Sequence, residues 1–235
     1  LLDLENKKLL WNKYIAGLPY KIMITPNLSR IVVADKGDSL SSYDKQGNLL
    51  WRHQDLQVLT DAAMDQNGSL VIALSHDGTI RAYDWLGKLL WMRGIGFGGH
   101  NAIDITKDGQ YITVGGGSSN SYYETHLLDS QGNTLWKHSQ SKTTSSSTHP
   151  YQLSTMSTII SDDGQYIASG YGTLSSGVQL FKGKIEDRKP LNKSWIDTDY
   201  LNMIQRNKKN KTIPPRLESP QSFFSRIVGF LSNLF

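Results

Sequence analysis

The sequence predicts an all-β protein built from small antiparallel sheets of four strands that repeat about every 40 residues. Two observations predict this. First, one segment recurs with strict internal spacing, as Asp44-Lys-Gln-Gly-Asn-Leu-Leu-Trp51, Asp84-Trp-Leu-Gly-Lys-Leu-Leu-Trp91 and Asp129-Ser-Gln-Gly-Asn-Thr-Leu-Trp136. Second, the apolar runs between these copies are short, rich in β-branched residues and bounded by glycine or asparagine, which favours strands over helices.

The repeat between Trp51 and Trp91 shows four strands in order. An apolar run over residues 59 to 64 is followed by Asn67-Gly68, a pair that supplies the positive φ angles of a tight hairpin. Residues 69 to 74 form the second expected strand and residues 79 to 83 the third, separated by the turn at Asp77-Gly78. The recurring segment then turns the chain into a fourth strand that ends at Trp91. Each repeat is therefore expected to be an antiparallel meander.

Four-stranded units at this period are the sequence pattern of a β-propeller, whose radial sheets are called blades. A weaker copy of the segment opens the chain and ends at Trp11, so successive tryptophans lie 40, 40 and 45 residues apart. The fourth outer strand is degenerate, with Phe181 at the place of the aspartate-led turn and Trp195 lying 59 residues after Trp136. The sequence thus predicts about four blades plus a partial one within residues 1–196: 1–19 (partial), 20–52, 58–92, 101–137 and 151–196.

The first copy aligns with the end of a repeat. Leu1-Leu2-Asp3 corresponds to Leu127-Leu128-Asp129, so the chain is expected to enter in the third strand of a blade. The common propeller ring has six to eight blades, which is more than four. We therefore expect this chain to be the C-terminal part of a larger propeller, or to complete one with another chain.

The motif Asp-x-x-Gly-x-x-Leu-Trp resembles the repeats of PQQ-like (pyrroloquinoline-quinone-like) and WD-repeat-like β-propellers, in which an outer-strand tryptophan docks between blades. The resemblance covers roughly residues 1–196. The motif is one residue shorter between Asp and Gly than in the quinoprotein enzymes, and it lacks the Trp-Asp pair of WD repeats. Cysteine is absent, so the vicinal cysteine pair of quinoprotein alcohol dehydrogenases is also missing. The resemblance therefore implies a cofactor-free member.

The tryptophans and aspartates of the motif are expected to have structural roles. Each indole should be wedged between adjacent sheets while its N–H finds a local acceptor: Trp11, Trp51, Trp91, Trp136 and Trp195. Asp44, Asp84 and Asp129 should cap their own turns. The glycines from Gly94 to Gly99 match a dinucleotide fingerprint but precede no helix. We therefore expect no catalytic, cofactor-binding or metal-binding residue, and no enzymatic activity.

In an up-and-down blade the connections alternate between the two faces of the propeller. The short turns near Asn27, Asn67, Asp108 and Asp163 share one face with the motif turns. The long connections lie on the other face, and such loops are often functional. We expect a partner-binding surface there, and its candidate residues are His53, His76, His100, Tyr122, Tyr123, His138, His149, Tyr151 and Tyr171. Exposed loops hold histidine and tyrosine for other reasons as well, so a surface without a binding role stays the alternative.

The C-terminal part differs in composition. Residues 1–181 carry 14 Lys and Arg against 16 Asp and Glu, whereas residues 182–235 carry 11 against 5. Residues 197–220 read as a basic, proline-containing linker, and residues 221–235 as a short amphipathic helix. Its apolar face should dock on a protein surface or contact a membrane: Phe223, Phe224, Ile227, Phe230, Leu231 and Leu234. Nucleic acid is not expected as a partner, because the positive charge is confined to the tail.

Together these features predict a non-catalytic scaffold that binds one or more proteins, either as part of a larger propeller or complex or with another chain that completes the propeller. The alternatives are a PQQ-like oxidoreductase and a carbohydrate-binding propeller of the cell envelope. The sequence leaves the compartment open, and the tail favours membrane association or the cell envelope.

Overall fold

The computed structural model describes residues 1–182 except 4, 16, 37, 55, 97–100, 118–121, 142–153 and 173–176. Every regular element in these residues is a β-strand. The described part of the chain contains no helix that could span a membrane. The all-β class is therefore confirmed, whereas the linker at 197–220 and the amphipathic helix at 221–235 lie outside the described residues.

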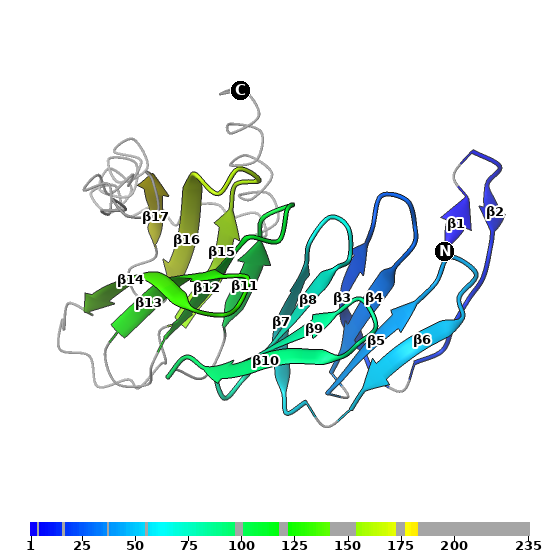
Figure 1. The fold of residues 1–235 in the computed structure, drawn as a ribbon, viewed down its shortest axis with the longest axis horizontal. Helices are drawn as coiled ribbons and strands as arrows, with labels where there is room; N and C mark the ends of the chain where they lie inside the picture. Colours follow the sequence, from blue (N-terminus) through cyan, green and yellow to red (C-terminus); the bar gives the residue numbers. More distant parts are fainter. Residues whose placement is uncertain are drawn as a thin grey trace, which may run out of the picture. The chain divides into compact units, whose positions relative to one another are not determined.

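The strands form five successive sheets, which we call blades 1 to 5, and consecutive strands are neighbours in each (Figure 1). Blade 1 has two strands, β1 (Leu2–Asp3) and β2 (Lys8–Leu9). Blade 2 has β3 (Pro19–Ile24), β4 (Ile31–Asp35), β5 (Ser39–Tyr43) and β6 (Leu49–His53). Blade 3 has β7 (Leu59–Met64), β8 (Leu70–Ser75), β9 (Thr79–Asp84) and β10 (Leu89–Gly94).

Blade 4 has β11 (Ala102–Ile105), β12 (Tyr111–Gly117), β13 (Tyr122–Asp129) and β14 (Thr134–Ser141). Blade 5 has three described strands, β15 (Ser154–Ile160), β16 (Tyr166–Gly172) and β17 (Gly177–Lys182), and Trp195 lies outside the described residues. One detail of the sequence alignment was wrong. Phe181 pairs with Ile167 as Tyr83 pairs with Val71, so it matches the residue before the aspartate, and Lys182 takes the aspartate's place.

The motif aspartates close the turns between the third and fourth strands, as expected. Asp84 Oδ1 accepts hydrogen bonds from the backbone N–H groups of Leu86 and Lys88, at 2.9 and 2.8 Å. Asp44 and Asp129 accept the same pair of bonds in their own turns. The turn glycines follow with φ between 81° and 83°, a conformation that suits glycine because it has no Cβ: Gly47, Gly87 and Gly132.

Both kinds of edge strand carry a β-bulge. In the fourth strands the register skips one residue before each tryptophan, namely Leu50, Leu90 and Leu135. In the first strands of blades 2, 3 and 5 it skips Tyr20, Thr60 and Met156. A bulge adds local twist and re-aims the side chains that follow it. The leucine of the motif is therefore an extra residue placed beside a tryptophan that must turn toward the next blade.

The apolar core lies between neighbouring blades. Val32 and Leu40 of blade 2 pack with Ala62 and Val71 of blade 3. The faces of blades 3 and 4 form a larger cluster that includes Leu74, Ile80, Ile103, Ile112 and Val114. Between blades 4 and 5, Leu127 packs with Ile160, Ile167 and Phe181. Because blade 3 is covered on both faces, its second strand β8 reads as a continuous apolar run from Leu70 to Leu74.

Candidate functional site

Each motif tryptophan joins its blade to the next one. The indole Nε1–H of Trp51 donates to the carbonyl oxygen of Trp85, 3.2 Å away in the motif turn of blade 3. Gly87 in that turn faces the ring, and a Cβ built on it would lie 2.6 Å from Trp51 Cγ. The same arrangement links Trp11 to Lys45 and Trp91 to Ser130, at 2.9 and 2.8 Å. We call this contact, between a motif tryptophan and the motif turn of the next blade with its glycine, a joint.

The residue two positions after each tryptophan also reaches the next blade. His53 Nε2 lies 2.7 Å from the carbonyl oxygen of Gly87, and its ring stacks on Tyr83 with centroids 4.4 Å apart. Arg93 donates to the carbonyl of Gly132 in the same way. The structure therefore assigns His53 a contact within a blade joint. Basic side chains occupy this position after Trp11, Trp51, Trp91 and Trp136, and this pattern is visible in the sequence: Lys13, His53, Arg93 and His138.

His138 occupies the corresponding place between blades 4 and 5. Its ring lies 5.1 Å from that of Phe181 and stacks beside Trp136. The Nε2 atom is buried and has no hydrogen-bond partner in the described part of the chain. Burial lowers the pKa of His138, which favours the neutral ring at neutral pH.

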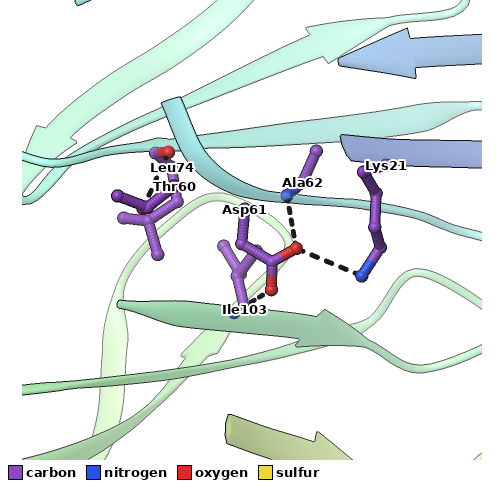
Figure 2. A network of polar contacts seen from close by, with 6 residues as sticks. All are labelled: Lys21, Thr60, Asp61, Ala62, Leu74 and Ile103. Atoms are coloured by element: carbon purple, nitrogen blue, oxygen red, sulfur yellow. Dashed lines mark hydrogen bonds and ion pairs between the residues drawn. The ribbon is translucent and has the colours of Figure 1, made fainter. Parts of the chain in front are cut away.

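Carboxylates on the first strand of one blade accept backbone hydrogen bonds from the first strand of the following blade. Figure 2 shows Asp61 of β7 between Lys21 of β3 and the backbone of β11. Asp61 Oδ1 lies 3.1 Å from Lys21 Nζ, and Oδ2 accepts the N–H of Ile103 at 3.1 Å. Asp104 in turn accepts the N–H of Ile160 on β15 at 2.9 Å, and burial raises its pKa. These oxygens are used in contacts between blades. In the described ranges no three His, Cys, Asp or Glu side chains form a group that could hold a metal.

The surface opposite the motif turns is called the loop face, and two of its described connections, around Leu56 and His76, are held by hydrogen bonds. The N–H of Leu56 donates to the Asp38 carbonyl at 3.1 Å, while the Leu56 carbonyl accepts from Ser75 Oγ at 2.7 Å. The N–H of His76 donates to the Val58 carbonyl at 2.6 Å. Leu56 is buried, whereas the side chains of Val58 and His76 are exposed. The tips of these connections are thus exposed on a fixed backbone.

The structure brings two of the candidate residues together. Tyr123 is buried and its ring centroid lies 4.9 Å from that of Tyr171, which joins the ends of blades 4 and 5. His76 stands at an exposed turn, and only the backbone of Tyr122 is described. The remaining loop candidates, His100, His149 and Tyr151, lie outside the described residues, as do the apolar residues of the tail from Phe223 to Leu234. Partner binding by the candidate residues stays a prediction.

A charged cluster beside Tyr123 gives blade 4 a pH-sensitive contact. Glu124 is bonded to Lys137, His126 and Ser139 at 2.8, 2.9 and 2.8 Å. Burial acts to raise the pKa of Glu124, but these hydrogen bonds outweigh it and lower the pKa to about 2. For His126 burial has the opposite effect and lowers the pKa, while the hydrogen bond to Glu124 acts to raise it.

A carboxyl group whose pKa is lower in the folded than in the unfolded state stabilises the fold at pH values above its unfolded-state pKa. This contribution is lost as the pH falls toward the folded-state pKa. We therefore expect the free energy of unfolding to decrease between pH 4.5 and about 2, and Glu124→Gln to flatten that decrease. Urea denaturation at a series of pH values measures it. Lys137→Met should reduce the slope in part. Superimposable pH profiles for Glu124→Gln and the unaltered chain would contradict the assignment.

Comparison with known proteins agrees with this architecture. The family model PQQ_2, described as outer membrane protein assembly factor BamB, matches residues 1–114 and, in a second overlapping match, 29–204. A search of curated proteins found no match. Among solved structures, the chain is similar to U3-55K, with a TM-score of 0.59 and 10% identity over 76% of this chain and 53% of that chain.

Two further structures show the same fold. The WD40 repeats of RRP9 match with a TM-score of 0.59 and 9% identity, covering 76% of this chain and 52% of that one. The WD40 domain of Toxoplasma gondii coronin matches with a TM-score of 0.57 and 9% identity, covering 74% and 44%. The chain spans about half the length of these structures, and the sheets described above are β-propeller blades. Since the matched residues run from 1 to 204 of 235, the chain belongs to the PQQ_2 family of β-propeller proteins, the family described as outer membrane protein assembly factor BamB.

Proposed function

We propose that this chain is a non-catalytic β-propeller scaffold that binds other proteins through its loop face, as part of a larger propeller or complex. The observation that carries the proposal is that hydrogen bonds hold the backbone of the loop that contains Leu56 and Val58. Leu56 is held by hydrogen bonds from Ser75 and Arg81 and to Asp38, while Val58 next to it is 59% exposed. A loop held in one conformation loses less entropy on binding than a free loop does.

Two further points support the proposal. The repeated residues of the motif make contacts within the chain. The aspartates accept hydrogen bonds in their own turns, and the indoles and turn glycines form the joints. The residues between copies are therefore free to differ from blade to blade on a common frame. The family description also names an assembly factor, a role exercised on other proteins.

The test is quantitative affinity capture with the full chain and a variant of the loop tips. Val58→Asp combined with His76→Asp places charge on the exposed tips without touching Leu56. We expect at least one specific protein to bind the unaltered chain and to be lost by about tenfold or more from the variant, as for an interface residue worth over 1 kcal/mol.

The matched control is Leu49→Asp on β6, since Leu49 is 55% exposed and Val58 59%. This control should retain the captured protein. The proposal fails if both variants capture the same proteins as the unaltered chain. It also fails if the purified chain takes up a quinone or calcium and then oxidises alcohols or sugars with a dye acceptor.

A further inference from the structure

Blade 3 exposes a group of large apolar side chains in one short segment, which we call the blade 3 patch. Trp85 and Leu86 lie in the motif turn, and Leu89, Leu90 and Met92 follow on β10. Their exposed fractions lie between 46% and 62%. Single exposed apolar residues are ordinary, but five of them within residues 85–92 indicate a surface that contacts something apolar.

The neighbouring blades provide an internal comparison. Where blade 3 has Trp85-Leu86, blade 2 has Lys45-Gln46 and blade 4 has Ser130-Gln131. Where blade 3 has Met92, blades 2 and 4 have Arg52 and Lys137. All three turns nevertheless accept an indole hydrogen bond from the preceding blade. The side chains of Trp85, Leu86 and Met92 are therefore not needed to build the turn or the joint, whereas Leu89 and Leu90 have the exposed counterparts Leu49 and Leu50 in blade 2.

The charges around the patch are positive. The guanidinium carbon of Arg30 lies 5.3 Å from the Trp85 ring centroid, a cation-π contact that holds a cation at the apolar surface. Lys88 belongs to the same segment, residues 85–93 contain no acid, and Arg93 at the end of the segment donates to the Gly132 carbonyl of blade 4. Asp84, the carboxylate next to this segment in the sequence, accepts the backbone N–H groups of Leu86 and Lys88. Tryptophan and leucine flanked by lysine and arginine are the composition of protein surfaces at a membrane–water interface.

Backbone pairing with an added strand explains the patch less well. β10 is the outermost strand of its sheet, but the bulge at Leu90 interrupts the regular edge that such a strand would follow. The features that a partner must match are therefore the exposed apolar side chains and the cations beside them. We propose that the blade 3 patch contacts the surface of an anionic lipid bilayer, with Trp85 and Leu86 entering the interface and Arg30 and Lys88 facing the headgroups.

One patch of this size gives weak and reversible binding, which salt reduces. The contact is peripheral. It lies on a different part of the blade from the loop face, so it does not depend on the protein-binding function proposed above.

The experiment measures cosedimentation of the full chain with vesicles of phosphatidylcholine containing about one third phosphatidylglycerol, at low salt. The test variant Trp85→Ser with Leu86→Gln installs the residues of blade 4. We expect its partition coefficient to fall by about tenfold or more, because two large apolar side chains no longer leave water. Vesicles of phosphatidylcholine alone should bind the unaltered chain distinctly less well.

Two comparisons separate this proposal from a general effect. Ile159→Gln removes a residue that is 55% exposed in blade 5, and it should bind vesicles as the unaltered chain does. Ser130→Trp with Gln131→Leu copies the turn of blade 3 into blade 4, and it should bind more tightly. An unchanged unfolding midpoint for each variant shows that the fold is kept.

The proposal is overturned if the unaltered chain does not bind anionic vesicles. It is also overturned if Trp85→Ser with Leu86→Gln binds them equally well, which would assign vesicle binding to another part of the chain. In either case the capture experiment on the loop face keeps its own outcome.

Discussion

Replacing Gly87 by alanine is expected to lower the free energy of unfolding by about 2–4 kcal/mol, which is a large share of the stability of a typical domain. Two costs add at this position. The backbone φ of +81° is unfavourable for any residue with a Cβ. The new Cβ would also lie 2.6 Å from Cγ and 2.8 Å from Cδ2 of Trp51, a ring fixed by its own hydrogen bond.

Gly96 separates the two costs. Its φ is +77°, and among the described residues, apart from its neighbours in the chain, no heavy atom lies within 4 Å of the position that a Cβ would take. Gly96→Ala should therefore cost only the backbone term, about 1 kcal/mol. Urea denaturation followed by tryptophan fluorescence and by circular dichroism measures both variants. Equal losses for Gly87→Ala and Gly96→Ala would show that contact with Trp51 contributes nothing.

Replacing Trp91 by alanine should cost about 3–5 kcal/mol, the range for truncating a large aromatic side chain in a core. Trp91 packs against the cluster between blades 3 and 4, and its indole donates to the Ser130 carbonyl at 2.8 Å. Trp91→Phe keeps much of the apolar contact but leaves that carbonyl without its donor. We therefore expect an intermediate loss for Trp91→Phe.

Trp85 is the matched control because it is also a tryptophan of blade 3 but lies in the motif turn, where 51% of its surface is exposed. Its described ring contact is with Arg30. Trp85→Ala should change the free energy of unfolding by about 0.5 kcal/mol or less, as surface substitutions usually do. A loss for Trp85→Ala as large as that for Trp91→Ala would contradict the division between joint and surface tryptophans.

The order of strands could be predicted because its signals are local. Gly68, Gly78 and Gly87 mark three successive turns, and each of these glycines has a positive φ in the structure. The capping role of Asp84 could be predicted for the same reason, since its partners lie two and four residues away. The wedge position of the tryptophans followed from their size and period.

The partners across the joints could not be read from the sequence. Trp51 and Trp85 are 34 residues apart, and Trp91 and Ser130 are 39 apart, so no local rule connects them. His53 was expected in a loop because it follows the motif tryptophan, yet it is the last residue of β6, its ring stacks on Tyr83 and its Nε2 lies beside the Gly87 carbonyl. A one-residue bulge at Leu90 also leaves no trace in an apolar run, because extra and paired residues have the same composition.

The site shows the same division. Alternation of connections between two faces placed His76 on the loop face, and this needs only the order of strands. The pairing of Tyr123 with Tyr171 depends on how blades 4 and 5 pack, and the fastening of Leu56 depends on Ser75 and Arg81 from other strands. Side chains from distant segments meet only once the blades are stacked.

The joints have a consequence for cooperativity. Each described indole bond ties a blade to the one that follows it, from Trp11 to Lys45, from Trp51 to Trp85 and from Trp91 to Ser130. A structure coupled through nearest neighbours behaves approximately as a one-dimensional chain of units, each stabilised by its own strands and by two interfaces. A lesion at Gly87 thus weakens one link, between blades 2 and 3, and leaves the link between blades 3 and 4 intact. Hydrogen exchange in such a variant should divide the protein into two blocks that open independently, with the boundary at β6 and β7.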